Sequence, residues 1–308
     1  MSDAASAPVA ATPLQRLRRF ALPAGTIIAF FLFLLATFPF DTLARRIEVE
    51  VQRTGGDVTI GSLGPAFLGF RARDVRLRPA STSGAPATEF RFDSVTIRPD
   101  LLAVILRRTS FSFGASAFGG SASGHAALSN DARAAGSLES LKLQTSDIDL
   151  HALPLRDLIG VELLGQLSSK TDLPSLLPPE AGSGTLTLSI KGLGIANATV
   201  SGLTIPRTVF GDLDATITVD KGTAKVDKAQ SRNGDIDLDI DGTIRLRPLL
   251  SLSQADLRVR LRPSERWLST NPAMRGLLGL LPRQPDGSYL VPLSGPLSRL
   301  QSPVNVRF

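Results

Sequence analysis

The chain has no cysteine and few of the other side chains that usually bind metals or carry out catalysis. Its 308 residues include two histidines, one tryptophan and one tyrosine. Disulfides and cysteine-ligated zinc are therefore excluded, and a histidine-based metal centre would have only His125 and His151 available. We predict that the protein holds no metal and no cofactor.

Catalytic motifs are also missing. The sequence contains no G-x-S-x-G elbow and no Gly-Lys dipeptide for a phosphate-binding loop. Gly192-Leu193-Gly194 lacks the third glycine of a dinucleotide fingerprint. Serines and threonines are abundant, but no base stands at a recognised spacing from them. These absences predict a protein that is not an enzyme, with no catalytic residues.

Aspartates at every second position of residues 235–241 could suggest a calcium loop. Along a strand, however, alternate residues lie about 6.8 Å apart and point in parallel, so their carboxylates spread instead of converging. We interpret them as a charged outer face that meets the alternating arginines of residues 258–262. Each cross-strand ion pair would contribute roughly 0.2–1 kcal/mol.

The net charge of +6 and the pI near 10.3 raise the question of nucleic-acid binding. The arginines alternate with apolar residues along apparent strands, and aromatic platforms for base stacking are scarce. We therefore interpret the positive charge as a solvated strand face, with anionic lipid head groups as the second interpretation. We predict no nucleic-acid partner.

Residues 20–40 are strongly apolar and contain no charged side chain. At about 1.5 Å per residue this stretch would extend roughly 31 Å, enough to cross the hydrocarbon core of a bilayer. Insertion of its apolar centre is worth roughly −2.5 to −5 kcal/mol, which outweighs Pro23 and Pro39 near the two ends. A cleaved signal peptide is the alternative, but residues 37–40 fit a cleavage site poorly. The predicted membrane anchor residues are Ile27, Ile28, Phe30, Phe31, Leu32, Phe33, Leu34 and Leu35.

Arginines flank this stretch on both sides. Three lie within residues 16–19 and two at positions 45 and 46, so the positive-inside rule favours a cytoplasmic N-terminus. We predict a single-pass protein of the bacterial inner membrane: a disordered cytoplasmic tail at 1–19, a transmembrane helix at 20–40 and a periplasmic β-rich domain at 41–308. Residues 41–53 fit both a strand and a helix, and the Gly-Gly pair that follows favours a juxtamembrane helix.

From residue 57 onward the apolar residues recur with a period of two. Such strands, joined by Gly-, Asp- and Asn-containing turns, predict an antiparallel sheet with one wet and one dry face. The candidate dry-face residues are Leu186, Leu188, Ile190, Leu213, Ile217, Val219, Ile236, Leu238, Ile240, Ile244, Leu246, Leu257, Val259 and Leu261. A second sheet, a helix or lipid must cover this face, because leaving it bare is costly. The predicted fold is mainly β: a curved antiparallel sheet, as an open groove or a sandwich, with a few short helices.

Several local irregularities are also expected. The apolar parity changes near Asp93–Ser94, which predicts a bulge or a turn. Residues 154–165 fit one or two helical turns, and the proline-rich residues 173–179 fit a loop. Trp267 lies in a segment that fits a short helix packed on the sheet edge. Residues 304–308 fit a last strand of the sheet.

The order of several segments resembles the longer form of the type II secretion system protein N family. The segments are the N-terminal anchor with residues 56–60, and residues 92–102, 149–158, 184–188, 234–244 and 286–295. The resemblance implies a non-enzymatic, inner-membrane-anchored accessory of the apparatus that exports folded proteins across the outer membrane. Its partners would be other components of that secretion system.

That family is similar in turn to the AsmA-like periplasmic proteins, whose anchored sheets form an apolar groove. This similarity implies an alternative function, a lipid-binding or lipid-transfer module that holds phospholipid acyl chains between the two membranes. The two hypotheses differ in what covers the dry face. A continuous open trough favours lipid, and a closed sandwich with a polar surface favours protein docking.

Overall fold

A computed structural model describes residues 37–53, 56–78, 88–100, 102–103, 106, 108–130, 137–156, 161–176, 182–196, 198–200, 203–247 and 253–297. The helices are α2 (Phe40–Arg53), α5 (Glu265–Thr270) and α6 (Pro272–Leu278). The strands are β1 (Asp57–Ala66), β2 (Gly69–Arg78), β3 (Phe90–Pro99), β4 (Thr109–Ala117), β5 (Gly120–Leu128), β6 (Leu138–Asp149), β7 (Leu163–Ser175), β8 (Ser183–Ile195), β9 (Ala198–Val200), β10 (Leu203–Ile205), β11 (Thr208–Asp220), β12 (Thr223–Arg232), β13 (Ile236–Arg245), β14 (Gln254–Pro263) and β15 (Tyr289–Pro296).

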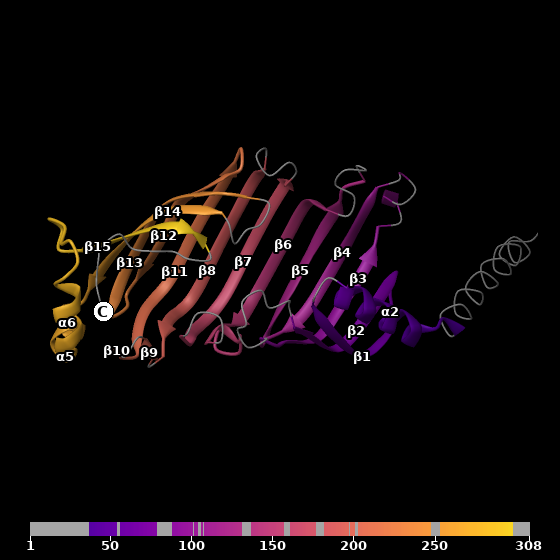
Figure 1. Ribbon diagram of the computed structural model, residues 1–308, viewed down its shortest axis with the longest axis horizontal. Coiled ribbons are helices and arrows are strands. Elements are labelled where there is room, and N and C mark those ends of the chain that lie inside the picture. Colours follow the sequence, from indigo (N-terminus) through magenta and orange to yellow (C-terminus); the bar gives the residue numbers. More distant parts are fainter. Residues whose placement is uncertain are drawn as a thin grey trace, which may run out of the picture.

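Thirteen of the strands form one antiparallel sheet in the order of the chain. The short strands β9 and β10 form a separate hairpin, so β8 pairs with β11 around them. Figure 1 shows the strands following one another across the molecule, from α2 at one end to α5 and α6 at the other. The prediction of a mainly β fold with an antiparallel sheet is confirmed.

The sheet is a single layer. Its strands contact their neighbours in the ladder, and β11 also approaches β13. In the part of the chain that the structure describes, no second sheet of comparable size packs against it. The sequence left an open groove and a sandwich as alternatives. The described strands do not form a sandwich.

Strand register separates the side chains into an apolar face and a polar face. One row of directly paired residues runs along the apolar face through all thirteen strands. It consists of Pro65, Phe70, Ile97, Phe113, Gly124, Leu143, Thr171, Leu186, Ile217, Val226, Gly242, Leu257 and Leu293. Because side chains alternate along a strand, the residues next to this row point to the polar face.

The first strands change their apolar parity, as expected near Asp93–Ser94. In β2, Ala72 and Val75 belong to one buried cluster although they are three residues apart, and Phe92 and Val95 in β3 join the same cluster. The register between β2 and β3 nevertheless has no shift. The left-handed backbone of Asp74 (φ 51°) accounts for the change of face.

Helix α2 covers the free edge of β1. The segment that was ambiguous in sequence is helical, and Val51 packs on the first apolar cluster. Glu48 Oε1 accepts a hydrogen bond of 2.9 Å from the backbone N–H of Ile60. This bond satisfies a donor that an edge strand would otherwise present to another chain.

The opposite edge, β15, is closed by prolines. The N–H of Leu290 points outward, where it donates to the Pro282 carbonyl at 3.0 Å. Because alternate N–H groups point to the same side, Pro292 and Pro296 occupy later outward positions and offer no N–H. Both edges are thus blunted against the addition of a further strand.

Two local predictions were only partly right at strand ends. Of the helical turns expected within residues 154–165, Leu155 and Arg156 are helical, but β7 begins at Leu163, which pairs with Ile195 of β8. A loop was expected at 173–179, but β7 continues to Ser175, and Pro174 lies where the register shifts. In both places pairing with a neighbouring strand overrides the local preference.

The predicted transmembrane helix at 20–40 lies outside the described residues except for its last four positions. The same holds for all the predicted anchor residues and for the last strand expected at 304–308. Among the residues that the structure describes, no helix has the length and apolar character needed to cross a membrane.

Candidate functional site

The predicted dry-face residues lie together. All of them except Leu246 belong to strands β8, β11, β13 and β14, and the register places them on the apolar face. Leu246 follows the last residue of β13, where its N–H donates to the Gly222 carbonyl at 2.8 Å. Leu213 and Ile190 are buried in one cluster there.

The apolar face is longer than the sequence indicated. Phe111, Phe113, Leu141 and Leu143 continue it through β4 and β6. Their alternation in the sequence could have placed them, although alanine and glycine between them weaken the pattern. Leu193 had no such signal, because it is out of phase with the residues before it in β8.

A backbone bulge brings Leu193 onto the apolar face. Gly192 has a φ of 63°, a left-handed conformation that glycine adopts without strain. Its N–H donates to Asp212 Oδ1 at 2.8 Å, which holds the bulge against β11. Ile190 and Leu193, three residues apart, are consequently both buried in the same cluster.

Helices cover the apolar face at its two ends. At the β1 end, the rings of Phe38 and Phe40 lie 6.0 and 6.3 Å from that of Phe70. At the β13–β14 end, α5 and α6 place Trp267 and Met274 over Ile236 (Figure 1). The prediction that Trp267 is a core anchor in a short helix is confirmed, since it is 6% exposed.

Between these helices the face has little cover. Leu153 and Leu155 pack on the cluster around Ile190. On β3 to β6 Phe113 and Leu143 are only half-buried, and Ile97 is 43% exposed. Among the described residues, the largest side chains below 2% exposure are those of Thr208, Ser231, Ser253 and Ser288, which all carry a hydroxyl group. A closed core would instead bury large aliphatic side chains completely.

Small residues make the centre of the face shallow. Ala115, Ala122 and Ala126 lie on it in β4 and β5. Gly124 lies between Phe113 and Leu143, and a Cβ at this position would be 2.7 Å from the Phe113 ring. Glycine thus gives the Phe113 ring room to lie flat against the sheet.

The apolar face is large compared with a lipid. Thirteen strands at about 4.8 Å spacing extend roughly 58 Å across the ladder. An acyl chain that fills one leaflet of a bilayer is about 15 Å long, half of the hydrocarbon thickness. Several chains could lie side by side on the section between the two helical ends.

Trp267 carries the only buried side-chain donor or acceptor of the described residues that lacks a hydrogen-bond partner. Its indole N–H lies among the apolar side chains of α5, α6 and β13. An unpaired buried donor costs about 1–3 kcal/mol. The packing of this ring over Ile236 must offset that cost.

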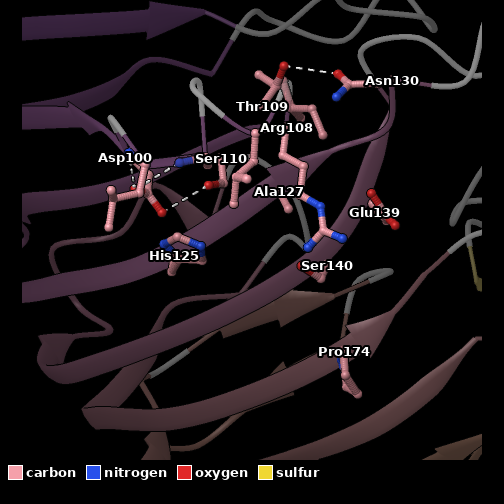
Figure 2. A pocket seen from close by; sticks show the side chains of 14 residues that line it. Asp100, Arg108, Thr109, Ser110, His125, Ala127, Asn130, Glu139, Ser140 and Pro174 are labelled. Atoms are coloured by element: carbon pink, nitrogen blue, oxygen red, sulfur yellow. Dashed lines mark hydrogen bonds between the residues drawn. The ribbon is translucent and has the colours of Figure 1, made fainter.

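A further cavity lies on the polar face. It has a volume of about 640 Å³ between β4–β6 and the segment before β4 (Figure 2). Asp100 accepts hydrogen bonds from two backbone N–H groups and from Ser110 Oγ, and Thr109 Oγ1 bonds Asn130. His125 lines the cavity but takes part in none of these bonds.

Charged side chains at several places stabilise the sheet itself. Arg78 and Arg91 hydrogen-bond Glu89 and lower its pKa. Ser288 and Arg262 lower the pKa of Asp286 to about 2, with the Ser288 hydroxyl as the largest cause. In the described ranges no group of three or more metal-ligating side chains occurs. His151 pairs with Glu162 at 2.6 Å instead.

No protein-family model, curated protein or solved structure matches the chain.

Proposed function

We propose that this protein binds the acyl chains of lipids along its apolar face. The observation that carries the proposal is a single-layer sheet on which apolar side chains such as Ile97, Phe113 and Leu143 stay exposed or half-buried. Each large apolar side chain kept from water is worth about 1.5–3 kcal/mol. Acyl chains would supply the missing layer without a second sheet.

Charge and shape support the same function. The row of paired residues on the apolar face, from Pro65 to Leu293, contains no charged side chain. Apolar patches of this extent on a protein surface mark binding sites for lipid or protein. The shallow centre at Gly124, between the bulkier Phe113 and Leu143, is suited to a flexible chain.

A photo-crosslinking fatty acid fed to cells expressing the full chain tests the proposal. We expect crosslinks on apolar-face peptides of the sheet, and at least a fivefold loss in Leu186→Lys, where a cation replaces a central apolar residue. The matched control is Thr185→Lys, which adds the same charge one residue away on the polar face. Ile217→Lys, in the same row as Leu186, serves as a second variant if Leu186→Lys folds poorly.

Two outcomes of this experiment would overturn the proposal. One is crosslinks confined to residues 20–40, with none in the sheet. The other is an equal loss in Leu186→Lys and Thr185→Lys. Far-UV circular dichroism and thermal melting of each purified variant separate loss of binding from loss of folding.

The order of segments that resembles the type II secretion system protein N family favours a second candidate function. In it, the protein is an inner-membrane-anchored, non-enzymatic accessory of that system, and its sheet docks other envelope components. An in-frame deletion distinguishes the two functions. Accumulation of exported enzymes in the periplasm with an intact outer membrane supports the secretion role. Normal export with a leaky or lipid-altered outer membrane supports acyl-chain binding.

A further inference from the structure

The polar face of β2 to β8 and β11 is hollowed by three adjoining grooves. The first, of about 280 Å³, is lined by Arg71 and Arg98 with serines of β3 to β5. The second, of about 460 Å³, shares Arg98 with the first and includes Lys170. The third, of about 360 Å³, shares Lys170 with the second. The three hollows therefore form one continuous track across the strands.

Three rows of directly paired residues form the floor of this track, and each row starts with an arginine. The first row is Arg73, Ser94, Ser116, Ser121 and Ser146. The second is Arg71, Thr96, Gly114, Ser123, Gln144 and Lys170. The third is Arg98, Ser112, His125, Lys142 and Asp172. In the second row, small and polar side chains thus lie between Arg71 and Lys170, and in the third row Ser112 and His125 lie between Arg98 and Lys142.

Most of the cations along the track are not neutralised by the protein. Lys142 pairs with Asp172 at 3.3 Å. Arg71 donates from Nε to Thr96 Oγ1 at 3.2 Å. Within the described ranges, neither Arg98 nor Lys170 has a carboxylate within ion-pair distance, and both are exposed. The track therefore combines hydroxyl donors and acceptors with uncompensated positive charge.

We propose that this track binds an anionic saccharide chain. Exposed cations attract the acidic groups of such a chain, and serine and threonine hydroxyls can bond its hydroxyl groups. A nucleic acid is disfavoured because Phe113, the one aromatic ring along the track apart from His125, belongs to the apolar face and offers no stacking platform. Arg98 and Lys170 stand four ladder steps apart, about 19 Å, so the chain carries negative charges over at least that length.

This binding site lies on the face opposite to the proposed acyl-chain site. Loss of one would leave the other intact, because the two sets of side chains alternate along the same strands. The apolar-face variant Leu186→Lys therefore serves as a control with normal saccharide binding.

Fluorescence anisotropy of a labelled heparin octasaccharide, with the full chain in a non-ionic detergent, tests the proposal. We expect Arg98→Gln combined with Lys170→Gln to raise the Kd at least tenfold. The matched control combines Arg258→Gln with Arg260→Gln, which removes the same charge from the polar face of β14, where both arginines pair with Asp241. Its Kd should change less than twofold.

Three results would overturn the proposal: similar Kd increases in the two double variants, binding of a neutral dextran of equal size, or binding of a single-stranded 12-nucleotide DNA within threefold of the heparin fragment. The first would indicate attraction by net charge alone, and the last a general polyanion surface. Thermal melting of both double variants verifies that each is folded.

Discussion

The polar face differs between the two halves of the sheet. In β12 to β14 several charges form ion pairs: Arg232 with Asp239 at 2.8 Å, and Asp241 with Arg258 and Arg260 at 2.7 and 3.0 Å. In β2 to β7 several cations stand among serines and threonines without a carboxylate partner. The same alternating pattern thus serves stability in one half and leaves charge for a ligand in the other.

The apolar face differs in a parallel way. Leu, Ile and Val side chains fill it in the C-terminal half, where Trp267 and Met274 pack on top. In the N-terminal half, Phe111 and Phe113 stand beside alanines and Gly124, and the face is shallow. The C-terminal half has the better-covered core, and the N-terminal half has more room for a bound molecule.

Among the variants that test the contrast between the two halves of the sheet, truncation of Trp267 should lower stability the most. Trp267→Ala removes the buried anchor and should cost about 3–5 kcal/mol. Phe113→Ala, on the open section, should cost roughly half as much. Because each strand contacts mainly its neighbours, hydrogen exchange should accelerate in β13 and β14 of Trp267→Ala while β4 to β6 stay protected.

Trp267→Phe is the control for that prediction. It keeps a ring in place and removes the unpaired indole N–H, so its stability in urea should lie within about 1 kcal/mol of the parent. A loss as large as that of Trp267→Ala would mean that the indole donor is satisfied. Equal losses in Phe113→Ala and Trp267→Ala would remove the contrast between the two halves.

The first edge of the sheet provides the next prediction. Glu48→Ala leaves the Ile60 N–H without its acceptor and should cost about 1 kcal/mol. Glu50→Ala is the matched control, since Glu50 pairs only with the exposed Arg53 in the same helix. Urea denaturation measures both, and equal losses would show that α2 does not protect the edge of β1 through Glu48.

The paired ladder gives a smaller expected effect. Asp241→Asn weakens its bonds to Arg258 and Arg260 and should cost roughly 0.2–1 kcal/mol per pair. Asp93→Asn, in the N-terminal half, should change stability by less than about 0.5 kcal/mol, because it is exposed away from such a ladder. Thermal melting at low salt and at 1 M salt measures both variants. Because 1 M salt screens exposed ion pairs, it should abolish most of the difference in stability between Asp241→Asn and Asp93→Asn.

The smallest expected effect is on the stability at acidic pH, through Asp286 in the connection between β14 and β15. The pKa of Asp286 is lowered to about 2 from 3.8, so its contribution is present above pH 3.8 and is lost as the pH falls through 2. Asp286→Asn should therefore flatten the pH dependence of unfolding between pH 4 and 2. An unchanged slope in this window would show that Ser288 and Arg262 do not hold the carboxylate in its charged form.

The sequence predicted strands and their dry side best where the alternation was strongest. The apolar residues within 236–246 and 257–261 keep one parity, and the structure places all of these apolar residues except Leu246 on one face. Trp267 was also placed correctly in a short helix. The errors at 163–165 and 173–175 occurred where a neighbouring strand, not the local residues, decides the conformation.

For this protein, the sequence alone determined that the chain forms amphipathic strands, because a period of two is a local property of neighbouring residues. It also determined the lack of cysteine and of catalytic motifs. Only the tertiary structure decided that thirteen strands lie in one layer in chain order, and that bulges such as the one at Gly192 change the exposed side. The grooves beside Arg98 and the uncovered apolar section arise from strand pairing, which joins residues far apart in the chain.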